Sequence, residues 1–241
     1  MSILVFRDSN ISCSAAATII ASQIIKKPNS VLGLSTGTAP EGVFVRLAGM
    51  TASGLLDWSD IKTFSTAEFL GFGSSNPDSC FGFLIKNLFS KVNINKSNVH
   101  SPDGTAEIPE EECRMYERRI SDAGGIDLLL LCIGINGRLG FNEPAKEFTS
   151  STHVSVFSQS AIEAHSKKFA NKSEVPGGAI TMGINTIMSA REIVLIANGA
   201  HKQDAVYKML NEPVNPLVPA SILQLHPSVT FVFDEAAADK L

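Results

Sequence analysis

Short apolar runs alternate with longer amphipathic or polar stretches along the chain. The apolar runs predict strands at residues 2–6, 31–34, 61–65, 128–133, 152–156, 179–181, 192–197 and 229–233, with a short one near residue 99. The intervening stretches predict helices at residues 11–27, 41–48, 79–88, 108–123, 160–168 and 184–189, a helix that opens at Lys202 and a short one that ends at Leu225. This alternation predicts an α/β fold: a doubly wound, mostly parallel, Rossmann-like sheet with helices on both faces. No repeat or change of composition divides residues 1–241, so we expect a single domain.

The most informative stretch covers residues 128–144. Its first six residues are apolar and predict a strand that is buried on both faces. Glycines then break the strand into a loop that carries Asn136, Arg138, Asn142 and Glu143. Polar groups at the carboxyl end of a buried strand lie where open α/β sheets bind their ligands. We therefore expect the functional site at this loop.

Three more polar loops follow predicted strands, at residues 35–40, 65–71 and 198–202. The carboxyl ends of parallel strands share one edge of a sheet, so all four loops are expected to lie together. Ser35, Thr36, Gly37 and Thr38 stand between a strand and a helix, an arrangement that directs backbone N–H groups at an anion. A Thr-Gly turn before a helix is equally a capping device. Lys202 adds a cation, so a phosphorylated small molecule is the economical ligand.

The amino-acid composition argues against several classes of binding partner. The net charge is −4 and 18% of the residues are charged, which argues against the clustered basic surface that nucleic acid requires. We find no signal peptide and no apolar run long enough to span a bilayer, so we expect a cytoplasmic protein without membrane contact. The four cysteines lie far apart without CxxC spacing, which predicts reduced thiols rather than disulfides or a zinc site.

Six motifs follow one another in a characteristic order. They are Leu-Gly-Leu-Ser-Thr-Gly-Thr-Ala-Pro, Ala-Glu-Phe-Leu-Gly, Gly-Ile-Asp-Leu, Gly-Ile-Asn-Gly-Arg-Leu-Gly-Phe-Asn-Glu-Pro, Thr-Met-Gly-Ile and Ala-Arg-Glu-Ile-Val-Leu. With them the chain resembles the glucosamine-6-phosphate deaminase/isomerase family from about residue 31 to residue 233. The galactosamine-6-phosphate isomerase branch and the more distant 6-phosphogluconolactonases share that fold.

The resemblance implies a reversible reaction on a small phosphorylated sugar. Glucosamine or galactosamine 6-phosphate is converted into a ketose 6-phosphate and ammonia by opening the ring and moving a proton between C2 and C1. Neither a metal nor an organic cofactor is implied. Members of the family include hexamers and smaller assemblies, so a homo-oligomer is compatible with the resemblance.

Two catalytic positions depart from the family pattern. An Asp-Glu pair, whose Asp is the proton-abstracting base, is replaced by Ala67-Glu68. Asp-Gly-His, whose His opens the ring, is replaced by Asn136-Gly137-Arg138, although Asn at the first position resembles the galactosamine branch. Arginine stays protonated at working pH and cannot shuttle a proton as imidazole does. Glu143 keeps its expected identity.

The binding residues match the family better. Residues 35–38, with Thr36-Gly37-Thr38 at their centre, match the phosphate loop, and Lys202 matches the phosphate lysine. Lys167 falls where an Arg normally contacts phosphate, so the charge remains while the bidentate fork is lost. Weaker or altered phosphate recognition is therefore expected.

Two main hypotheses follow for function. In the first, the protein is an isomerase or deaminase in which Glu68 or Glu143 serves as the base and Arg138 stabilises an enediolate oxygen. In the second, it binds a sugar phosphate without turnover, as a sensor or regulatory partner. Another reaction, such as lactone hydrolysis, is a third alternative. For Glu68 a solvated loop carboxylate is an equal expectation, and we expect structural or exposed roles for His100, His153, His201 and His226.

Overall fold

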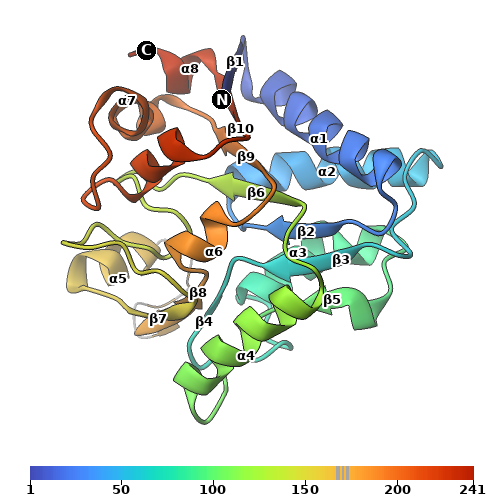
Figure 1. Ribbon diagram of the computed structural model, residues 1–241, viewed down its shortest axis with the longest axis horizontal. Coiled ribbons are helices and arrows are strands. Elements are labelled where there is room, and N and C mark those ends of the chain that lie inside the picture. Colours follow the sequence, from blue (N-terminus) through green and yellow to red (C-terminus); the bar gives the residue numbers. More distant parts are fainter. Residues whose placement is uncertain (167–168, 170, 172–173) are drawn as a thin grey trace.

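A seven-stranded parallel sheet forms the centre of the molecule (Figure 1). The computed structural model describes residues 1–166, 169, 171 and 174–241, without the side chains of residues 160, 164 and 165. The strand order is β1-β10-β9-β6-β2-β3-β5, and every neighbouring pair is parallel. The strands are β1 (Ser2–Phe6), β2 (Val31–Leu34), β3 (Lys62–Ser65), β5 (Val99–His100), β6 (Leu128–Cys132), β9 (Glu192–Ala197) and β10 (Val229–Asp234). The predicted doubly wound α/β fold is confirmed.

Strand β6 is buried on both faces, as its run of leucines predicts. Leu128 and Leu130 pack into one apolar cluster with helices on one face of the sheet. Leu129 and Leu131 pack into another cluster on the opposite face. This division follows from the two-residue period of a strand, which sends successive side chains to opposite faces.

Helices cover both faces of the sheet (Figure 1). Residues of α1 (Ser9–Lys26), α2 (Thr38–Ala52) and α3 (Cys80–Asn87) belong to the first cluster. The second contains residues of α4 (Pro109–Asp122), α6 (Ile184–Met188), α7 (Gln203–Asn211), α8 (Glu235–Ala238) and the 3-10 helix η5 (Pro219–Leu225). Short 3-10 helices also occur at η1 (Phe89–Lys91), η2 (Lys96–Asn98) and η4 (Ala200–Lys202). No helix in the described part of the chain is long and apolar enough to cross a membrane.

A second, smaller sheet was not anticipated from the sequence. The strands β4 (Ala67–Phe69), β8 (Gly178–Thr181) and β7 (His153–Val156) form it in that order, and both pairs are antiparallel. Two of the predicted strands therefore belong to this sheet rather than to the parallel one, and β4 occupies part of an expected loop. The small sheet and helix α5 (Gln159–Ser166) lie together beside the main sheet (Figure 1). Phe69, Phe141 and Phe157 fill the apolar cluster of this part of the molecule.

Asp127, immediately before β6, joins three segments at the amino ends of the strands. Its carboxylate accepts hydrogen bonds from Lys27 Nζ at 2.7 and 2.8 Å, from Val31 N at 2.8 Å and from Arg191 Nη1 at 2.9 Å. Burial opposes ionisation of Asp127, but the hydrogen bonds and charges of these partners outweigh it and lower the pKa of the carboxyl group.

Acid titration is expected to remove the stability that Asp127 contributes. Because its pKa is lower in the folded chain than in the unfolded one, its contribution is fully present above about pH 4 and is lost as the pH falls below that value. The Asp127→Asn variant lacks this contribution at every pH. Urea unfolding of both proteins between pH 6 and 2 gives their free energies of unfolding. The difference between the two free energies should shrink with acidification, and a difference that does not change with pH would contradict the assignment.

Candidate functional site

The four predicted loops meet at one edge of the parallel sheet. They follow β9, β6, β2 and β3, which are consecutive neighbours in the strand order. A cavity of about 490 Å³ opens between them. Its lining consists of Ser35, Thr36, Gly37, Thr38, Ala39, Thr66, Ala67, Cys132, Ile133, Gly134, Ile135, Asn136, Arg138, Gly140, Phe141, Glu143, Ser158, Ala161, Ile196, Ala197, Asn198 and Lys202. The sequence predicted the position of this cavity, but not the contribution of Ser158, which follows β7, or of Ala161 in α5.

The loop after β2 presents the amino end of α2 to the cavity. Gly37 occupies the N-cap position with a φ of 147°, and no side chain caps the helix. A Cβ atom at Gly37 would also approach Cys132 Sγ to 3.3 Å. The Thr-Gly turn thus supplies the N-cap residue, as the capping alternative predicts, but no side-chain acceptor, so the first N–H groups of a 15-residue helix are left for another acceptor. This arrangement suits an anion such as a phosphate.

Ser35 adds a hydroxyl group to the same wall. Its side chain is 3% exposed, and its Oγ has no hydrogen-bond partner. Buried hydroxyl groups are seldom left unpaired, and the exceptions point to an absent partner. A bound ligand that approached this wall would supply one.

The central loop gathers three of the predicted site residues around one carboxylate. Asn136 Nδ2 donates to Glu143 Oε2 at 2.7 Å, and Arg138 Nε lies 3.3 Å from Glu143 Oε1. Arg138 also donates to the carbonyl oxygen of Gly140, and its guanidinium group lies 5.1 Å from the centre of the Phe141 ring. These contacts fix the guanidinium group beside the carboxylate. Glu143 is thus an ion-paired carboxylate that lines the cavity.

The backbone of this loop depends on glycine at two positions. Gly137 and Gly140 have φ values of 84° and 56°, which favour glycine over residues with a side chain. Gly137 N donates to Gly134 O, and Gly134 N donates to Arg138 O, which closes the turn. Asn142 Nδ2 then donates to Leu139 O and to the carbonyl oxygen of Met182, the residue that follows β8, which ties the loop to this segment. The turn therefore holds Asn136, Arg138 and Glu143 on one side.

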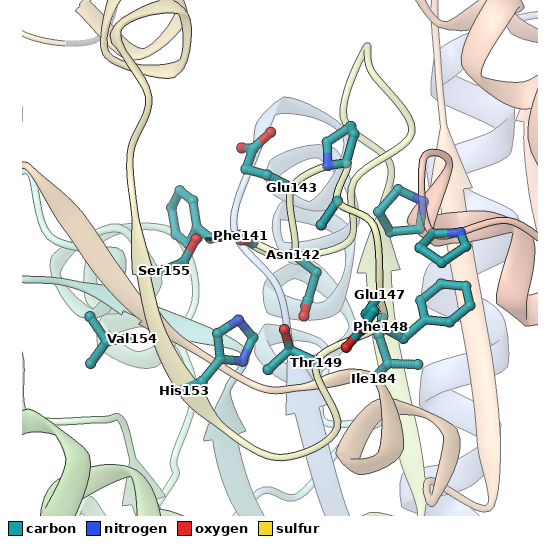
Figure 2. Close-up of a pocket in the computed structure, with 14 residues that line it drawn as sticks. Phe141, Asn142, Glu143, Glu147, Phe148, Thr149, His153, Val154, Ser155 and Ile184 are labelled. Atoms are coloured by element: carbon teal, nitrogen blue, oxygen red, sulfur yellow. Dashed lines mark hydrogen bonds between the residues drawn. The ribbon is translucent and has the colours of Figure 1, made fainter.

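Below this loop lies a second, smaller cavity of about 230 Å³. Figure 2 shows Glu143 and Asn142 pointing to opposite sides of the loop, with His153 and Thr149 on the Asn142 side. His153 Nδ1 lies 3.0 Å from Ser151 O, and burial lowers the pKa of its imidazole. Cavities on both sides of the loop share Phe141 and Glu143 in their walls.

Ala67 and Glu68 have different surroundings although they are adjacent in β4. Ala67 lines the main cavity and presents only a methyl group to it. Glu68 is 2% exposed, does not line that cavity, and accepts from the backbone N–H groups of Phe69, Cys80 and Phe81 at 2.8, 2.9 and 2.9 Å. Burial raises the pKa of this carboxyl group, and the backbone hydrogen bonds oppose that effect. The expectation of a solvated loop carboxylate is therefore wrong.

Glu68 anchors the amino end of α3, so its substitution should affect stability. Glu68→Gln replaces one acceptor oxygen by an NH₂ group that faces a backbone N–H donor, and we expect a loss of about 1–3 kcal/mol in the free energy of unfolding. Glu110→Gln, at an exposed position of α4, is the matched control. Thermal and urea unfolding measure both variants. Equal stability of Glu68→Gln and the control would contradict the anchoring role.

Lys202 contributes a cation from the loop after β9. Its Nζ donates to Ile133 O at 2.6 Å, so the ammonium group lies beside the carboxyl end of β6. Asn198, on the same wall, accepts from Ser12 Oγ at 2.7 Å. Lys167, the other predicted phosphate residue, lies outside the described residues.

The histidines with described side chains are absent from the lining of the main cavity. His226 is buried, with Nε2 2.9 Å from Ala190 O, and His100 stacks on Phe64. His201 is exposed. No group of three or more His, Cys, Asp or Glu side chains suited to a metal ion occurs in the described part of the chain.

Fold and site together define an α/β protein in which a helix terminus without a side-chain cap and an ion-paired carboxylate line one cavity at the edge of the sheet. The family model for glucosamine-6-phosphate isomerases and 6-phosphogluconolactonase matches residues 10–232. The chain therefore belongs to this family.

Individual relatives give the same assignment. The glucosamine-6-phosphate deaminase of Clostridium novyi (strain NT) is 46% identical over 241 residues, which is 100% of both chains. That of Clostridium botulinum (strain Langeland) is 46% identical over 226 residues, 94% of this chain and 93% of the relative. The structure of a monomeric glucosamine-6-phosphate deaminase superimposes with a TM-score of 0.97 at 36% identity and covers 100% of both chains. The 6-phosphogluconolactonase of Trypanosoma brucei, at 16% identity and a TM-score of 0.77 over 100% and 98% of the two chains, shares the fold.

Proposed function

We propose that the protein binds a hexosamine 6-phosphate, with glucosamine 6-phosphate as the first candidate, and converts it slowly to a ketose 6-phosphate and ammonia. The observation that carries the proposal is the cavity at the carboxyl ends of β2, β3, β6 and β9, which is lined by the amino end of α2, by Glu143 and by Lys202. Deaminases named for this substrate are 46% identical to the chain and support the choice.

In the proposed binding mode the phosphate lies at the amino end of α2. The N–H groups of that helix, the hydroxyl groups of Ser35, Thr36 and Thr38, and the ammonium group of Lys202 supply donors and charge there. The sugar then extends toward Arg138 and Glu143. Glu143 is the sole carboxylate among the described lining residues, so proton transfer between C2 and C1 is assigned to it rather than to Glu68.

The direct test is an assay of ammonia and ketose phosphate after incubation with glucosamine 6-phosphate or galactosamine 6-phosphate. We expect slow release of both products at equal rates, with glucosamine 6-phosphate preferred. A thermal shift assay with the same sugar phosphates detects binding. If the sugar phosphate stabilises the protein but neither product is released, the protein binds the sugar without turnover. Absence of both signals at millimolar ligand would contradict the proposal as a whole.

A second candidate function is binding without turnover, and Ala67 and Arg138 favour it. Alanine offers no acid or base, and a permanently protonated guanidinium group cannot exchange protons with a ring oxygen at working pH. Losing a general base costs about 10²–10⁴-fold in rate. A chain that keeps the binding groups and loses two proton carriers is suited to sensing the sugar phosphate.

A further inference from the structure

The distribution of charged residues around the main cavity affects which sugar phosphate it binds. Arg138, Glu143 and Lys202 are the charged residues among the described side chains that line it. With Lys202 assigned to the phosphate under the proposed function, Arg138 and Glu143 remain at the sugar end. Their charges cancel one another.

Both oxygens of Glu143 are already engaged. Arg138 Nε lies 3.3 Å from Oε1, and Asn136 Nδ2 donates to Oε2 at 2.7 Å. Arg138 is held in this place by the carbonyl oxygen of Gly140 and by the Phe141 ring, so it cannot turn away without losing both contacts. The carboxylate therefore has little attraction left for a cationic group of a ligand.

The wall formed by β4 supplies no substitute anion. Ala67 presents a methyl group there, and Glu68 is turned to the backbone N–H groups of Phe69, Cys80 and Phe81 outside the cavity lining. Neighbouring side chains in a strand point to opposite sides, so Glu68 cannot reach the cavity while β4 keeps its register. An ammonium group at the sugar end would thus meet the guanidinium group of Arg138 without an unpaired carboxylate to balance it.

We propose that Arg138 selects against a positive charge on C2, so that the preferred ligand is a hexose 6-phosphate with a neutral C2 substituent. This inference rests on the proposed function for the location of the phosphate and the sugar. It concerns which sugar phosphate binds most tightly, whether or not the bound sugar is turned over. A hydroxyl or carbonyl oxygen on C2 accepts a hydrogen bond from the guanidinium group, whereas an ammonium group is repelled by it.

The test compares glucose 6-phosphate with glucosamine 6-phosphate, which differ only in the substituent on C2. Isothermal titration calorimetry on the full chain gives both dissociation constants. We expect glucose 6-phosphate to bind about tenfold more tightly near neutral pH. At a pH above the titration of the sugar amine this ratio should fall toward one, because the amine is then uncharged.

Three variants tie the preference to Arg138. Arg138→Gln removes the positive charge and leaves Glu143 without its ion pair, so the preference should disappear or reverse in favour of glucosamine 6-phosphate, whereas Arg138→Lys should retain it. Arg118→Gln, on the exposed surface of α4, is the matched control and should leave the ratio unchanged. If Arg138→Gln fails to fold, the pH series on the wild-type protein decides the question.

Two results would overturn the inference in distinguishable ways. The wild-type protein could bind glucosamine 6-phosphate more tightly, or the preference could be unchanged in Arg138→Gln and at high pH. Either result would contradict the role of Arg138, while the proposed function would stand. Absence of binding by either sugar phosphate removes both.

Discussion

Replacing Ala67 by Asp and Arg138 by His in the same chain is expected to raise the rate of ammonia release from glucosamine 6-phosphate by about 10²–10⁴-fold. The new Asp side chain would enter the cavity from the position of Ala67. The new imidazole would stand beside Glu143, where the guanidinium group now forms an ion pair. The Asp carboxylate can accept a proton as a base and the imidazole titrates near neutral pH, whereas neither alanine nor arginine exchanges protons there. Initial rates at saturating substrate measure the effect.

The matched control is the double variant Ala67→Asn with Arg138→His. Asn has nearly the size and shape of Asp but no proton chemistry, so this variant should gain far less rate. Circular dichroism and thermal unfolding establish that both variants fold. A folded Ala67→Asp, Arg138→His variant with no gain over the wild-type rate would show that the loss of chemistry extends beyond these two residues.

Replacing Glu143 by Gln is expected to reduce turnover of the wild-type protein by about 10²–10⁴-fold, to the background of the assay. Gln keeps the shape of the side chain, and its amide oxygen can still accept from Asn136 or Arg138, so the loop should remain folded. Its amide group cannot take up the proton from C2.

Stability and binding separate this effect from a structural one. The melting temperature of Glu143→Gln should stay close to that of the wild-type protein. The variant should still bind glucosamine 6-phosphate through the untouched Lys202 end of the cavity, although more weakly, because the charge of Arg138 is no longer balanced. Unchanged turnover in Glu143→Gln would assign the proton transfer to another group. A large fall in melting temperature would instead assign a structural role to the carboxylate.

The parallel sheet was predictable because its strands carry their own signature. The run of leucines in β6 requires burial on both faces, and the loops that follow β2, β3, β6 and β9 carry the polar residues. Their convergence needed one fact that local patterns do not contain, namely that these four strands are neighbours. The expectation that the loops meet rested instead on the shared edge of a parallel sheet. The family that the motif order indicated is confirmed by the relatives.

The small antiparallel sheet and the surroundings of Glu68 were not predictable in the same way. Strand β4 has three residues, and its partner β8 is more than 100 residues away in the chain, so no local period reveals the pairing. The sequence around Glu68 is typical of a loop carboxylate. Its backbone donors, at the start of α3, come close to it only in the folded chain. Short-range patterns thus located the cavity, while long-range packing decided which carboxylate lines it.

Calorimetric titration with glucosamine 6-phosphate and with unphosphorylated glucosamine tests the central claim most directly. If the amino end of α2 and Lys202 hold a phosphate, only the phosphorylated sugar binds measurably, and Lys202→Met weakens its binding by at least about tenfold. Equal binding of the two sugars, or an affinity that Lys202→Met leaves unchanged, would contradict the assignment of this cavity as a sugar-phosphate site.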